Sequence, residues 1–201
     1  GYKVSGGLHG VGAAVVNALS EYLEVYTNID GNKYYVRFEN GGETKVPLQD
    51  KGMSQEKGST VTCKPEPEIF VETVEWSHET LRDRLQQMAF LNKGIKIIFI
   101  DEREPSDKQK QEFEYENGLL EYVAFMNKNK TPIHKEIAYC EGEEDDIIVE
   151  VSMQYNDGFV PNIYSFCNNI NTQEGGTHED GFRLALTRVI NNYAKENGLT
   201  D

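Results

Sequence analysis

Apolar residues recur about one helical turn apart in several stretches of the chain, which indicates helices with one buried face. One helix is predicted from Leu8 to Tyr22. A second is predicted from Ser77, a residue type that favours the N-cap position, to about Asn92. Two more are predicted at 119–127 and at about 177–196, the last ending at Gly198. The apolar positions of the first helix are Val11, Val15, Ala18, Leu19 and Tyr22.

Other stretches alternate between apolar and polar residues, as expected for strands with one face on a core. Asp30-Gly31 is a typical hairpin turn between two of them. The predicted strands are 23–28, 34–39, 44–48, 59–64, 95–100, 147–155 and 162–168. Helices and strands together predict an α+β protein with mixed or antiparallel sheets.

Residues 101–116 are charged and poor in apolar side chains, and they include Pro105. This segment is predicted to be a solvated loop that runs into a short edge strand, with a domain boundary near residue 115. Around the helices, Trp76 is predicted to form a hydrophobic staple. Thr177 and Asp180 are predicted to form a capping box, with Asp in place of Glu or Gln.

The composition fits a soluble protein and narrows the possible functions. Of 201 residues, 38% are apolar and 27% charged, and no apolar run approaches the roughly 20 residues that a membrane helix needs. The net charge of −14 argues against a generic nucleic-acid binder, although a local basic patch stays possible. The three cysteines are far apart and are interpreted as idle thiols in a reducing cytosol.

The segment GGLHGVG at residues 6–12 leads directly into the first predicted helix. Glycines allow close backbone approach, and the free N–H groups of a helix start favour phosphate. The segment is not a P-loop, because Gly-Lys-Ser/Thr is missing, and its glycine spacing does not match the dinucleotide fingerprint. Tight helix packing or a plain turn is the alternative interpretation of the glycines.

The segment YKVSGGLHGVG at residues 2–12, continued by VVNALS at 15–20, resembles the ATP lid and glycine motif of the B subunits of bacterial type II topoisomerases. These subunits, of DNA gyrase and topoisomerase IV, belong to the ATPase superfamily of Hsp90, histidine kinases and MutL. The resemblance extends over the whole chain, and YNDGF and NNI at 155–159 and 168–170 favour its gyrase branch. Other matching segments are GSTV at 58–61, FLNKG at 90–94, NKNKTPIH at 127–134 and EGGTH at 174–178.

The resemblance implies two domains. Residues 1–114 would be the C-terminal part of a gyrase/Hsp90-type ATPase α/β sandwich, beginning within the ATP lid. Residues 115–201 would be part of a transducer domain that resembles ribosomal protein S5 and couples nucleotide state to DNA passage.

The resemblance also implies which residues contact the nucleotide. Tyr2 and Lys3 match lid positions, with the tyrosine at the adenine. Ser59 stands where the family usually has threonine at the floor of the adenine pocket, and it keeps the hydroxyl. The residues implied around the phosphates are Gly7, Leu8, His9, Gly10, Val11 and Gly12.

The family's catalytic glutamate, magnesium-binding asparagine and adenine-reading aspartate all precede the lid, and its γ-phosphate lysine follows the last residue of this chain. The resemblance therefore implies no catalytic residue and no metal ligand here, and we expect the chain alone not to hydrolyse ATP. The complete protein is expected to use ATP and Mg²⁺ in the cytoplasm. Its expected partners are DNA, the gyrase A protein and a second copy of gyrase B, with no membrane contact.

Two other functions stay open at this point. A nucleotide-gated dimerisation module without catalysis would use the same glycine loop. A dinucleotide-dependent oxidoreductase is disfavoured by the glycine spacing. Arg183 and Arg188 are most simply interpreted as solvated or ion-paired, with the alternative that one of them lines a cavity for DNA.

Overall fold

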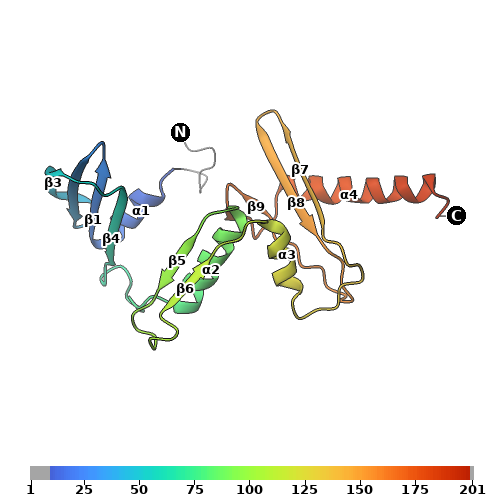
Figure 1. The fold of residues 1–201 in the computed structure, drawn as a ribbon, viewed down its shortest axis with the longest axis horizontal. Helices are drawn as coiled ribbons and strands as arrows, with labels where there is room; N and C mark the ends of the chain where they lie inside the picture. Colours follow the sequence, from blue (N-terminus) through green and yellow to red (C-terminus); the bar gives the residue numbers. More distant parts are fainter. Residues whose placement is uncertain (1–9, 200–201) are drawn as a thin grey trace. The chain divides into compact units, whose positions relative to one another are not determined.

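The computed structural model describes residues 10–199, which form two compact units that divide between Trp76 and Ser77 (Figure 1). The predicted loop at 101–116 is thus internal to the second unit. The assignment of 1–114 to an ATPase domain and 115–201 to a transducer refers to the domains of the family, not to these compact units. It stays a prediction.

The first unit is a short helix followed by a four-stranded antiparallel sheet in the order β3-β2-β1-β4. Its β1–β2 turn is Asp30-Gly31, as predicted, with both residues at positive φ (52° and 81°). The elements are α1 Gly12–Ala18, β1 Ser20–Ile29, β2 Asn32–Glu39, β3 Glu43–Met53 and β4 Gly58–Pro65.

The predicted helix 8–22 is too long at both ends, because α1 begins only at Gly12 and ends at Ala18. Leu19 is the C-cap of α1, and Tyr22 lies in β1, where it pairs with Glu39. β1 pairs with strands on both sides and is rich in aromatic and β-branched residues, so sheet formation prevails over the helical spacing of Leu19 and Tyr22.

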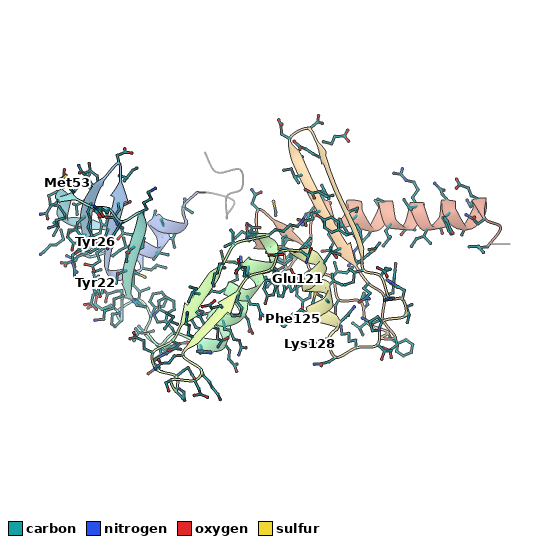
Figure 2. The ribbon with its side chains drawn as sticks, in the orientation of Figure 1. Tyr22, Tyr26, Met53, Glu121, Phe125 and Lys128 are labelled. Carbon is teal, nitrogen blue, oxygen red and sulfur yellow. The ribbon has the colours of Figure 1, made fainter. Side chains whose placement is uncertain are left out.

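The two faces of this sheet differ in chemistry. Leu23 and Val25 share one face with Val61, because side chains alternate along a strand and register partners point the same way. The opposite face is polar and aromatic: the guanidinium of Arg37 lies 4.2 Å from the ring centroid of Tyr22, and Tyr26 packs on a second tyrosine (Figure 2). Thus the sheet has one apolar and one polar face.

The second unit contains three longer helices and three two-stranded antiparallel sheets. The three predicted helices are confirmed almost residue for residue. β7 was not predicted, because its sequence AYCEGEE is acidic and contains glycine, and the strand predicted at 162–168 is reduced to two residues. The elements are α2 His78–Leu91, β5 Ile97–Ile100, β6 Lys110–Phe113, α3 Leu119–Asn127, β7 Ala138–Glu144, β8 Ile147–Met153, β9 Phe166–Cys167, β10 Ile170–Asn171 and α4 Thr177–Glu196.

The core of the second unit lies between α2 and the β5–β6 pair. Ala89 is fully buried, with Phe99 and Phe113 packed beside it. Phe90, 2% exposed, stacks on Tyr115, which also packs against this core, and on Tyr122 of α3. Helix α2 therefore has two buried sides, one on the strands and one on α3.

The predicted helix ends are partly right. Ser77 caps α2 as expected, its hydroxyl accepting the backbone N–H of Thr80 at 3.3 Å. Gly198 ends α4 at φ 63°, as predicted. The capping box at Thr177 is wrong: the N-cap residue is Gly176, whose φ of 156° starts the helix without a side-chain cap among the described residues. Trp76 is half exposed.

Candidate nucleotide site

The described part of the glycine loop is Gly10, Val11 and Gly12, which lead into α1. Gly10 has φ +66°, a conformation that glycine adopts more easily than residues with a side chain. Gly12 has no such requirement, and apart from its chain neighbours and the backbone of its own helix, a methyl group there would have no atom of the described residues within 4 Å. Backbone conformation therefore explains glycine at Gly10, whereas the residues that the structure describes give no reason for glycine at Gly12.

The start of α1 can receive an anion. Val11 is the N-cap residue, it is half exposed, and within residues 10–199 no side chain satisfies the first N–H groups of the helix. Among the described residues these N–H groups have no side-chain acceptor, and they carry partial positive charge. Because α1 has only seven residues, its dipole is small, and most of the attraction must come from the N–H groups themselves. Outside the described residues lie Tyr2, Lys3, Gly7, Leu8 and His9.

Ser59 lies in β4 opposite Thr27 of β1, and their hydroxyl oxygens are 2.8 Å apart. Both residues point to the apolar face of the sheet, the face of Val25 and Val61. The result is an exposed pair of hydroxyls on an apolar surface, which suits a ring that carries nitrogen donors and acceptors. Along the sheet, Ser59 is not next to the glycine loop. β1 begins beside α1 at Ser20, and Ser59 pairs with Thr27, near the other end of β1.

A second cluster, far apart in sequence, joins His78, Asp101 and Glu104. Nδ1 of His78 lies 2.9 Å from Asp101 and 3.9 Å from Glu104, and the ligand atoms lie within 4.8 Å of one another. However, Arg103 donates from Nε and Nη2 to both oxygens of Asp101, at 2.8 and 2.7 Å. These bonds, with that from His78, hold the pKa of Asp101 well below its usual range. The cluster is thus a satisfied hydrogen-bond and ion-pair network between the start of α2 and the segment after β5 rather than a metal site.

Arg183 in α4 is ion-paired, as predicted for it. Its guanidinium donates to Glu179 one turn earlier, at 2.8 Å, and this bond lowers the pKa of Glu179. Ser165 also donates to Glu179, at the edge of a hollow of about 410 Å³ beside the start of α4. Within residues 10–199, no helix has the length and apolarity that a membrane-spanning helix needs.

Comparison with known proteins identifies the chain's relatives. Residues 118–201 match the family model described as DNA gyrase B. The DNA gyrase B protein of Bacillus mycoides is 52% identical over 99% of this chain, and that of Spiroplasma citri is 50% identical over 96%. The chain spans 48% and 30% of the length of these two relatives.

Solved structures agree with the sequence relatives. The 43K ATPase domain of Thermus thermophilus gyrase B, in complex with an aminocoumarin, matches 96% of this chain with a TM-score of 0.80 and 31% identity, and 52% of that domain is covered. The gyrase B protein of Myxococcus xanthus matches 92% with a TM-score of 0.76; at 24% identity this likeness shows the fold alone. The α+β prediction is confirmed, and this chain is related to DNA gyrase B proteins along nearly its whole length, which corresponds to part of the length of those relatives.

Proposed function

We propose that this chain is part of the ATP-operated clamp of DNA gyrase B, which couples ATP binding and hydrolysis to double-strand DNA passage and negative supercoiling. The observation that carries the proposal is the identity of about half, over nearly the whole chain, to gyrase B proteins. It also disfavours the topoisomerase IV equivalent and a dimerisation module without catalysis. ATP and Mg²⁺ would serve the complete protein, with DNA, a second gyrase B chain and gyrase A as partners in the cytoplasm.

Within this function, residues 1–114 would belong to the ATPase domain and 115–201 to the transducer. The catalytic glutamate of the family is not among the residues that the resemblance matches, so residues 1–201 alone would not hydrolyse ATP. ATP binding would favour the closed clamp, because the free energy of ATP binding would stabilise both the ordered lid and the dimer.

The nucleotide would contact two parts of the first unit. Its phosphates would lie at the start of α1, where free N–H groups and the turn at Gly10 favour an anion. Its adenine would lie over the apolar sheet face beside the hydroxyls of Ser59 and Thr27. The residues proposed at the lid and phosphates, beyond Gly10 to Gly12, are Tyr2, Lys3, Gly7, Leu8 and His9.

Gly12→Ala tests this placement sharply. Residues 10–199 leave space for the methyl group, and alanine favours a helix, so the fold should keep its stability. If the phosphates approach Gly12, the methyl group displaces them, and a full-length gyrase B chain carrying Gly12→Ala should bind a non-hydrolysable ATP analogue about tenfold or more weakly in calorimetric titration.

Gly181→Ala is the matched control. It lies in α4, where a methyl group also meets open space, and it should change neither affinity nor fold. Equal affinity of the Gly12→Ala and unaltered chains would show that the nucleotide does not approach the start of α1 and would refute the proposed site.

A further inference from the structure

Helix α2 and the residues just after it contact three later elements of the second unit. The first contact is the aromatic stack, in which the ring centroid of Phe90 lies 4.8 Å from that of Tyr122 and 5.5 Å from that of Phe125. Gln87 also donates to the hydroxyl of Tyr122 at 2.9 Å. This contact is largely apolar, and Phe90 is buried at its centre, so α3 is fixed to α2.

The second contact holds the turn between β9 and β10. Asn168 and Asn169 form this turn with φ values of 48° and 66°. Nη2 of Arg84 donates to the carbonyl of Asn169 at 2.8 Å, and the side-chain amide of Asn169 donates to Asn92 at 3.1 Å. Hydrogen bonds therefore hold the turn at both its main chain and its side chain.

The third contact holds the β7–β8 hairpin through a single side chain. Nζ of Lys93 donates to the hydroxyl of Tyr139 in β7 at 2.6 Å and lies 2.8 Å from the carboxylate of Glu150 in β8. The bond to Glu150, followed by that to Tyr139, raises the pKa of Lys93, so the lysine stays charged.

The hairpin needs this cation. Glu141 and Glu150 are direct register partners across β7 and β8, and like charges in that position repel. Nζ of Lys93 lies 4.0 Å from Glu141 and 2.8 Å from Glu150, so one ammonium offsets the repulsion between the two carboxylates.

Gly118 leaves room for the stem of Lys93. A methyl group at Gly118 would lie 2.7 Å from Cγ of Lys93, and the φ of +52° at Gly118 also disfavours other residues. At the other end, the lysine side chain is 40% exposed, so water reaches the ion pair. A partly hydrated polar contact can open and close, whereas the buried Phe90 stack cannot do so without exposing apolar surface.

We propose that Lys93 is a positioning residue that holds the β7–β8 hairpin on the end of α2 through the Glu141–Glu150 pair, and that this contact passes movement between residues 77–114 and the hairpin. The inference rests on the proposed function, because in an ATP-operated clamp this contact would link the two family domains. Lys93 acts through the hairpin and contacts no nucleotide.

Charge reversal tests the contact. Lys93→Glu would place three carboxylates together, and we expect the backbone amides of β7 and β8 to exchange hydrogen about tenfold faster or more. The double variant Lys93→Glu with Glu150→Lys restores one cation between two carboxylates and should restore slow exchange. The control is Lys96→Glu, because Lys96 is paired with Glu112 of β6 rather than with a residue of the hairpin.

The consequence for the clamp is measured on the same variants in full-length gyrase B assembled with gyrase A. Lys93→Glu should lower the number of supercoils introduced per ATP by about fivefold or more while the ATPase rate without DNA stays within about twofold, and the double variant should recover. If hydrogen exchange in β7 and β8 is unchanged in Lys93→Glu, the proposed contact is refuted. If exchange is faster but the number of supercoils per ATP is unchanged, the coupling role of the contact is refuted. An unaltered protein that hydrolyses no ATP would instead refute the proposed function, while the exchange data would still decide the contact.

Discussion

Removing the ring of Phe90 should destabilise the second unit more than any comparable change at its surface. Phe90 is 2% exposed, and its ring centroid lies 3.7 Å from that of Tyr115 and 4.8 Å from that of Tyr122, with both rings nearly parallel. Phe→Ala in a core costs about 3–5 kcal/mol, and stacked rings add about 0.5–1.5 kcal/mol per pair beyond burial. We therefore expect Phe90→Ala to lower the free energy of unfolding by about 4 kcal/mol.

The assay is thermal unfolding followed by near-ultraviolet circular dichroism, which reports on tyrosine packing. For a protein of this size, about 4 kcal/mol corresponds to a decrease in Tm of roughly 8–16 °C. Phe159→Ala is the matched control, because the side chain of Phe159 is fully exposed and its loss should change stability by less than about 0.5 kcal/mol.

Two outcomes would refute the reasoning. If Phe90→Ala and Phe159→Ala shift Tm equally, burial and stacking at Phe90 do not stabilise the unit. If Phe90→Ala lowers Tm as expected but leaves the near-ultraviolet signal of the remaining native protein unchanged, the tyrosines do not depend on the Phe90 ring for their packing.

Two further changes test the N-cap of α2 and the Asp101 hydrogen-bond network beside it. The folded-state pKa of Asp101 lies well below its ordinary 3.8, so its stabilising contribution is present above about pH 4 and is lost as pH falls toward the folded-state value. Asp101→Asn disrupts the paired bonds from Arg103 and should lower the free energy of unfolding at pH 7, measured by urea unfolding. The free energy of unfolding of this variant should also fall less steeply below about pH 4. The control is Asp107→Asn in the exposed loop, which should show neither effect. Ser77→Ala removes the N-cap and should lower the free energy of unfolding by about 1 kcal/mol. The control is Ser106→Ala, and an equal decrease in both variants would contradict the capping role.

The fold was predictable where local sequence and tertiary structure agree. The helix from Ser77 has its cap, its apolar side and its end within one stretch of sequence, so its limits were right. The helix from Leu8 to Tyr22 was extended too far, because pairing of β1 with two strands decides the structure after Ala18. That pairing joins residues as distant in sequence as Ser20 and Pro65, which a local pattern does not contain.

The candidate site was only partly accessible from sequence. Gly10 and Gly12 were found from the glycine-rich segment before a predicted helix and from the family resemblance, but the positive φ at Gly10 and the open space at Gly12 needed coordinates. Ser59 came from the family resemblance, and its Thr27 partner needed the register of β1 and β4. The Lys93 contact was missed altogether, because FLNKG at 90–94 carries no sign of the hairpin that its lysine meets.

The three two-residue turns at Asp30-Gly31, Asp145-Asp146 and Asn168-Asn169 have a consequence for how the chain folds. All six residues have positive φ, and each pair joins strands that are neighbours in sequence. Asp and Asn reach this conformation more readily than other side-chain-bearing residues, so each turn can form early and close its hairpin in about 1–10 μs. The slower step in the first unit should be the arrival of β4 beside β1, because in the described sheet this is the pairing between strands that do not follow one another in sequence.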